Sequence, residues 1–172
     1  LEATRLFVSQ SFEESYDSSV LTIGSEFEIA FAEIIHVHGV TSLEVLTPSL
    51  DVVNTGAPNA PIAPTAADLA TLLASPEDYE GVLVSVSSVT ISSGNWPNRG
   101  GSSSLTIGDG TGSTTLRIDA DTNIDGQPRP DGAFDLVGIF TQFDTADPFD
   151  SGYQILPRFY TDLAQSGIPA SP

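Results

Sequence analysis

The stretch from Tyr79 to Leu163 constrains the fold more than any other part of the chain. It consists of short runs in which apolar and polar residues alternate, and clusters of Gly, Asp, Asn and Ser separate the runs. Such alternation is typical of half-buried strands, and such clusters are typical of the turns that join them. We expect one long strand over 82–91, a hairpin turn at Asp109 and Gly110, and two final strands. The stretch therefore predicts a small antiparallel β-barrel.

The order of these elements resembles that of the OB-fold modules appended to secreted bacterial nucleases, phosphoesterases and multidomain surface proteins. The similarity covers the long first strand, the Gly- and Asn-rich loop 92–102, the hairpin, the acidic connection at 119–126 and the last two strands. The resemblance implies the architecture of the barrel. It does not imply an activity, because OB-folds host many functions.

The composition indicates a folded chain with an acidic surface. Hydrophobic residues make up 40% of the 172 residues, which argues against disorder despite a formal net charge of −18. All five basic residues are arginines, and there is no lysine. Such a surface repels phosphate backbones, because nucleic-acid affinity comes largely from Lys and Arg. It attracts cations and favours solubility at high salt, so we expect a halophilic or extracellular source.

The chain contains no cysteine, so it has neither a disulfide framework nor a thiol site. It contains no methionine, not even at position 1, and no signal-peptide pattern at its start. We therefore expect a processed chain that is secreted or displayed on the cell surface. The apolar run 27–40 is interrupted by two Glu and two His, which is too polar for a membrane-spanning helix.

Residues 56–64, GAPNAPIAP, predict a linker, because neither helices nor paired strands accommodate such a density of Pro and Gly. A short helix is expected directly after it, with Thr65 as its N-terminal cap and Asp68 reaching back toward that cap. Three leucines between 69 and 73 would form its apolar face, and Ser75-Pro76 would end it.

The first part of the chain contains segments that parallel the predicted barrel. The pairs are residues 24–34 with 132–139, residues 39–45 with 152–156, and residues 6–10 with 105–109. The first part has no counterpart of the long strand 82–91. A barrel without its opening strand leaves an unpaired edge, which strand addition by another chain would satisfy. Two alternatives would explain the missing strand: a chain boundary that falls within the barrel, or a first unit that is a smaller sheet.

We therefore predict an all-β fold of tandem small OB-fold-like barrels, the first lacking its opening strand, joined by a Pro-rich linker and one short helix. The predicted units are an incomplete OB-like β unit at 1–55, a linker and short helix at 56–78, a complete OB-fold-like barrel at 79–165 and a tail at 166–172.

Two histidines form one candidate site. His36 and His38 lie two residues apart in a predicted strand, so both side chains would point to the same face. Two imidazoles at this spacing could hold a transition metal, with Glu33 and Glu44 completing the ligand set. The alternative is a structural role on a half-polar strand.

The acidic connection is a second candidate site. Its oxygen-bearing side chains alternate along the chain: Asp119, Asp121, Asn123 and Asp125. Calcium prefers such a cluster, although an EF-hand would need glycine and glutamate where this chain has Ile124 and Pro130. The alternative is that these short polar side chains shape turns.

A third candidate site is the loop 92–102, which joins the first two strands of the barrel. Loops at this position of an OB-fold bind ligands. Trp96 and Arg99 would offer a stacking platform with one positive charge, suited to a base or a sugar ring. The alternative is that Trp96 packs against the barrel or a neighbouring subunit.

The sequence contains no nucleophile elbow, phosphate-binding loop or zinc-protease motif, so we do not expect an enzyme. The leading hypothesis is a non-catalytic extracellular β module that acts by protein–protein contact. It would be a structural or self-assembling subunit, or an accessory domain of a larger secreted protein. One alternative is a nucleic-acid-binding or substrate-positioning module of an extracellular nuclease or phosphoesterase. The other is an adhesion module stabilised by calcium.

Overall fold

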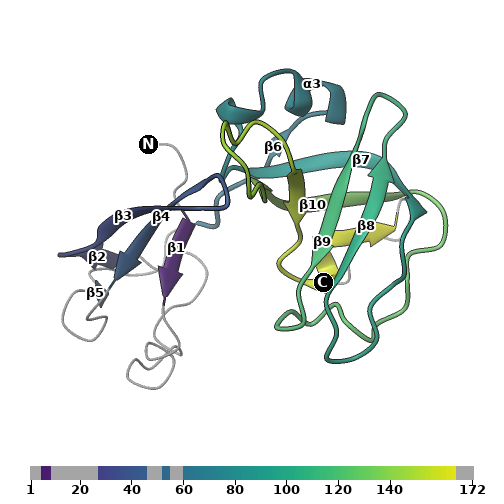
Figure 1. Cartoon of the computed structure of the whole chain (residues 1–172). Coiled ribbons are helices and arrows are strands. Elements are labelled where there is room, and N and C mark those ends of the chain that lie inside the picture. Colours follow the sequence, from purple (N-terminus) through teal and green to yellow (C-terminus); the bar gives the residue numbers. More distant parts are fainter. Residues whose placement is uncertain (1–4, 9–26, 46–51, 55–59, 166–172) are drawn as a thin grey trace.

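The computed structural model of the chain describes residues 5–8, 27–45, 52–54 and 60–165 (Figure 1). Regular structure in these residues is mostly β, as predicted. The strands are β1 (Arg5–Val8), β2 (Phe27–Ile29), β3 (Glu33–Val37), β4 (Val40–Val45), β5 (Val52–Asn54), β6 (Thr65–Ala66), β7 (Leu83–Ser93), β8 (Ser103–Gly108), β9 (Ser113–Ile118), β10 (Phe134–Gln142), β11 (Tyr153–Leu156) and β12 (Leu163–Gln165). The helices are α3 (Leu69–Ala74) and the 3-10 turns η2 (Pro76–Asp78) and η3 (Tyr160–Asp162).

Five strands of the largest sheet close into a barrel. Around the barrel the order is β7, β8, β9, β11 and β10, and β10 pairs again with β7. The pairing of β9 with β11 is parallel, and the other four pairings are antiparallel. A five-stranded Greek-key barrel of this kind is the OB-fold. The predicted barrel is therefore confirmed, and its teal-to-yellow strands are seen in Figure 1.

Within the barrel, strand β7 pairs with both β10 and β8 because it bends at Ser88. Residues 83–89 pair with β10, whereas residues 90–93 pair with β8. The alternation of buried residues is interrupted between Val86 and Val89, and Ser88 there has a left-handed φ of 58°. The backbone N–H of Ser88 donates to Oδ1 of Asp135 at 2.9 Å. This β-bulge lets one strand serve both sides of the barrel.

The interior of the barrel holds the hydrophobic core. Its strand residues are Val84, Val86 and Val89 of β7, Leu105 and Ile107 of β8, Leu116 and Ile118 of β9, Phe134, Leu136 and Phe140 of β10, and Ile155 of β11. Leu69 and Leu72 of α3 are fully buried against the same cluster, so the short helix packs on the barrel. Among the described residues, no helix is long and apolar enough to cross a membrane.

The N-terminal sheet repeats part of the strand pattern of the barrel. Strand β1 pairs parallel with β4, and β4 pairs antiparallel with β3, as β9, β11 and β10 do. The predicted match of residues 39–45 to residues 152–156 agrees with this pattern. The match of residues 6–10 to residues 105–109 is wrong, because β1 takes the position of β9 rather than of β8. Strands β2 and β5 form a separate antiparallel pair.

The predicted helix is present, but its cap differs from the expectation. Thr65 and Ala66 form strand β6, which pairs parallel with Val84 and Ser85. Asp68 is the N-terminal cap instead, and its side chain accepts the backbone N–H of Thr71 at 2.7 Å. Thr65 therefore does not cap the helix, because it lies in a strand that pairs with the barrel.

Asp109 ties the predicted hairpin turn to the start of α3. One carboxylate oxygen accepts the N–H of Leu69 at 2.8 Å, and the other accepts the N–H groups of Thr111 at 2.8 Å and Gly112 at 3.0 Å. Partial burial by itself would raise the pKa of Asp109. The hydrogen bonds outweigh this effect and lower the pKa from 3.8 to about 2.

Replacing Asp109 with Asn should lower the free energy of unfolding at pH 7 by about 1–2 kcal/mol, because a neutral amide accepts weaker hydrogen bonds. The depressed pKa of Asp109 means that its contribution is present above about pH 4 and is lost as the pH falls toward about 2. Urea unfolding at pH 7, 4 and 2.5 should show that the difference in unfolding free energy between wild type and D109N becomes smaller as the pH falls. The same loss in D131N, which alters an exposed carboxylate, would contradict this assignment.

Candidate binding pocket on the barrel surface

The turn between β3 and β4 docks on the barrel at the end of β10. The backbone N–H of Asp144 donates to the carbonyl oxygen of His38 at 2.8 Å. The His38 ring packs against the Phe143 ring, with the ring centroids 4.4 Å apart. Gly39 lies directly against the side chain of Gln142. These contacts join the N-terminal sheet to the barrel.

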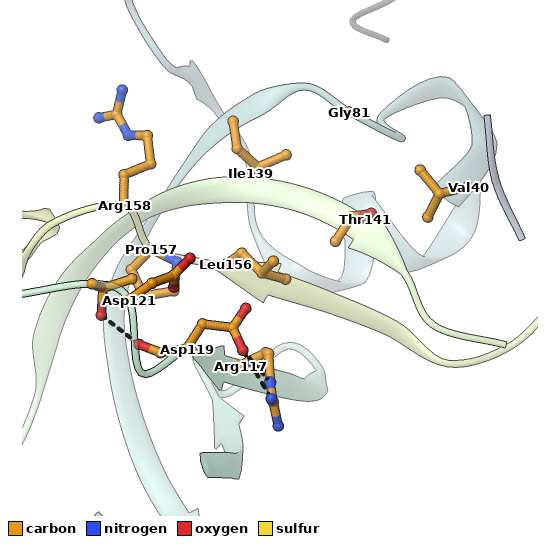
Figure 2. A pocket seen from close by; sticks show the side chains of 11 residues that line it. Val40, Gly81, Arg117, Asp119, Asp121, Ile139, Thr141, Leu156, Pro157 and Arg158 are labelled. Atoms are coloured by element: carbon orange, nitrogen blue, oxygen red, sulfur yellow. Dashed lines mark hydrogen bonds and ion pairs between the residues drawn. The ribbon is translucent and has the colours of Figure 1, made fainter. Parts of the chain in front are cut away.

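A cavity of about 310 Å³ lies on the outer face of the barrel beside this junction (Figure 2). Ile139 and Leu156 are direct partners across the β10–β11 ladder, so their side chains share one face. Their chain neighbours Phe140 and Ile155 are fully buried in the core. Ile139 and Leu156 must therefore face outward, where they line the cavity.

The cavity combines an apolar floor with a charged rim. We call Val40, Ile139, Leu156 and Pro157 the apolar floor. Val40 is the first residue of β4 and is only 4% exposed, so the N-terminal sheet contributes one residue of the apolar floor. The remaining lining residues are Gly81, Arg117, Asp119, Asp121, Thr122, Thr141 and Arg158. The volume lies at the low end of the range for small-molecule sites, so the cavity suits one side chain or a small ligand.

Both arginines of the rim are already paired. Arg117 donates from Nε at 3.1 Å and from Nη2 at 2.8 Å to Oδ1 of Asp119. Arg158 donates from Nε at 3.1 Å and from Nη2 at 3.0 Å to the two carboxylate oxygens of Asp162. Such forked pairs hold the guanidinium planes in place. The positive charge of the rim is therefore neutralised within the chain.

Asp121 differs from the other charged residues of the rim. It is exposed, and it forms no ion pair within the described part of the chain. In Figure 2 its carboxylate extends past Pro157 toward Leu156. The pocket thus presents one unneutralised negative charge beside an apolar floor.

The two histidines do not share one strand face, so that prediction is wrong. Strand β3 ends at Val37, and His38 lies in the following turn with a left-handed φ of 53°. The His38 ring packs on the barrel, whereas Nδ1 of His36 lies 3.3 Å from Oγ1 of Thr41. The turn at Gly39 breaks the alternation that the sequence argument assumed. Within the described ranges, no three His, Cys, Asp or Glu side chains gather as a metal site.

The four residues of the predicted calcium site contact separate partners. Asp119 binds Arg117, and Oδ1 of Asn123 accepts the first N–H of η3 at 2.8 Å. Asp125 accepts a backbone N–H of the β7–β8 loop. Asp121 lies at the rim of the pocket. Three of the four thus hold loops and strands in place, and calcium binding stays a prediction.

Trp96 and Arg99 lie on the β7–β8 loop, as expected. The indole Nε1 of Trp96 donates to the carbonyl oxygen of Gln127 at 2.7 Å, and its ring packs partly buried against the core. Arg99 is exposed and lies close to Gly126. The indole therefore joins this loop to the acidic connection. The role of both residues in ligand contact stays a prediction.

The pocket and the docked turn were not predicted from the sequence. One signal was present in the sequence. In the alternation of the two strands, Ile139 and Leu156 fall at outward-facing positions, and such positions are usually polar in an antiparallel strand. Val40 carries no such signal, because its place in the pocket depends on a contact between segments about a hundred residues apart in the chain.

The fold and the pocket define a small OB-fold-type β-barrel with an additional N-terminal sheet. No protein-family model matches the sequence, and no curated protein sequence matches it. Among solved structures, the chain is similar to the crystal structure of the p204 HINb domain, with a TM-score of 0.38 and 13% sequence identity. The similarity covers 91% of this chain and 76% of that chain. Our assignment of the fold depends on the strand order of the barrel.

Replacing Gly39 with Ala should separate the β3–β4 turn from the barrel. Gly39 has a φ of 89°, and an added Cβ would overlap the side chain of Gln142. We expect hydrogen exchange at the Asp144 amide to become at least about tenfold faster, which corresponds to about 1.4 kcal/mol of local stability. G132A is the matched control, because Gly132 has a φ of 82° but open space at the Cβ position. Equal acceleration in both variants would refute the docking contact as the cause.

Proposed function

We propose that the protein is a non-catalytic extracellular β module that acts by protein–protein contact. In this proposal the outer edge of β3 accepts an extended segment of a partner by strand addition. The observation that carries the proposal is the position of β3 at the end of the strand order β1-β4-β3. Within the described residues, β3 pairs with β4 and with no other strand.

The side chains around this edge support the proposal. Ile34 is 71% exposed, and Phe31 just before the strand is 77% exposed. Proteins usually block an edge strand with lysine, proline or a bulge, and the sequence EIIHV of β3 contains neither lysine nor proline. A partner segment would gain main-chain hydrogen bonds and cover these apolar side chains.

The charges near the edge favour a partner other than a second copy. Glu33 lies directly opposite Glu44 in the β3–β4 ladder, and like charges in such a pair are destabilising. A further acidic strand would add to this repulsion, and the chain as a whole has a net charge of −18. The acidic, lysine-free composition also supports the extracellular part of the proposal. An accessory domain of a larger secreted protein fits these features better than a homopolymer.

Hydrogen exchange with a model strand tests the proposal. The probe is the uncharged peptide Thr-Ile-Thr-Val-Thr-Ile-Thr, acetylated and amidated, because its residues favour strands. We expect added peptide to slow exchange at the β3 amides that point away from β4. I34K should abolish this protection, because a lysine at the edge opposes strand pairing.

The matched control is I62K, which places the same charge on an isoleucine that is 83% exposed and lies outside the sheets. Protection that is absent in wild type, or that I62K removes as completely as I34K, would contradict strand addition at β3. Light scattering in about 1 M salt, where the Debye length is about 3 Å, then shows whether copies of the chain associate once their repulsion is screened.

A further inference from the structure

We propose that the pocket on the barrel receives a lysine or arginine side chain from a partner protein. Its methylene stem would lie on the apolar floor, and its charged end would meet the carboxylate of Asp121. The pocket is a second contact site, separate from the β3 edge. Only the source of the cation, a partner protein, depends on the function proposed above.

The shape and lining of the cavity fit an amphipathic side chain. Long basic side chains bury their carbon stems along apolar surface and keep their charged ends near water. The floor offers such surface in Ile139, Leu156 and Val40, and the volume of about 310 Å³ leaves room for one long side chain. Asp121 is exposed at the rim, where a charged end would remain partly hydrated (Figure 2).

The charges of the rim favour a cation over an anion. Arg117 and Arg158 are each engaged by a carboxylate through two hydrogen bonds. An anionic ligand would have to compete with Asp119 and Asp162 for these guanidinium groups. A cation would meet neutralised arginines and the carboxylate of Asp121, which forms no ion pair among the described residues.

The composition of the chain indicates that the cation comes from another protein. The chain contains no lysine, and a second copy carries the same net charge of −18, so its five arginines would approach the pocket only against that repulsion. The net charge of −18 attracts basic surfaces and raises the rate at which they meet the chain. A basic partner would therefore be drawn to the surface that carries the pocket.

Three capped tetrapeptides test the proposal: Gly-Ile-Lys-Gly, the same peptide with norleucine in place of lysine, and the same peptide with glutamate. Each is titrated into the full chain in buffer with EDTA, and methyl NMR signals of labelled Val, Ile and Leu report binding. We expect the lysine peptide to shift the methyl signals of Val40, Ile139 and Leu156. It should bind about 2- to 5-fold more tightly than the norleucine peptide, the size expected for an exposed ion pair. The glutamate peptide should bind most weakly.

D121N provides the decisive comparison. We expect it to weaken the lysine peptide about 2- to 5-fold and to make the lysine and norleucine peptides bind equally well. D131N removes an exposed carboxylate outside the pocket lining and should leave the preference for lysine intact. Equal binding of the lysine and norleucine peptides to wild type, or an equal loss in D121N and D131N, would overturn the proposal.

The remaining outcomes separate this proposal from the proposed function. Capped lysine amide that binds as tightly as the lysine peptide would assign the pocket to small amines and overturn the protein source. Strand addition is read at the β3 amides with an uncharged peptide and is blocked by I34K. A failure there, together with lysine-dependent shifts at Ile139 and Leu156, would contradict strand addition and support the pocket.

Discussion

The bend of β7 at Ser88 is the constraint on which the rest of the structure depends. The left-handed residue and its hydrogen bond to Asp135 let β7 pair with β10 before the bend and with β8 after it. This double pairing closes the barrel and fixes the register of β10. A slip of one residue would turn every side chain of β10 to the other face. Phe140 would then leave the core, and Ile139 would leave the pocket.

The pocket follows from this register through the end of β10. Ile139 and Thr141 near the end of β10 line the cavity, and Gln142 and Asp144 directly after them contact the turn at His38 and Gly39. The docked turn places Val40, the residue after it, in the apolar floor of the cavity. The site is therefore built from two sheets, and its shape depends on contacts that neither sheet makes alone.

Local patterns predicted the barrel strands well, because alternation and turn residues act over a few neighbours. The hairpin at Asp109 is such a case, since its turn is formed by bonds within the same four residues. The bend at Ser88 has a local signal that the prediction of one continuous strand over 82–91 did not use: two serines separate Val86 from Val89, where strict alternation would place one. Asp68 caps α3 in place of the predicted Thr65, because Thr65 pairs with β7. The pocket required the pairing of β10 with β11 and the docking of the turn, which are long-range contacts without a local signal.

The distribution of charge in this chain links its stability to its surface. Carboxylates accept hydrogen bonds at structural positions. The pKa of Asp144 is lowered mainly by a hydrogen bond from the Ser151 side chain and next by one from the N–H of Ala146. The backbone N–H of Asp144 itself binds the β3–β4 turn. The contribution of such a group is present above its unfolded pKa and is lost as the pH falls below that value. Arg117 and Arg158 form ion pairs within the chain, with Asp119 and Asp162. Protonation of Asp144 would remove the hydrogen bonds that order this loop, and would thus loosen the junction between the β3–β4 turn and the barrel beside the pocket.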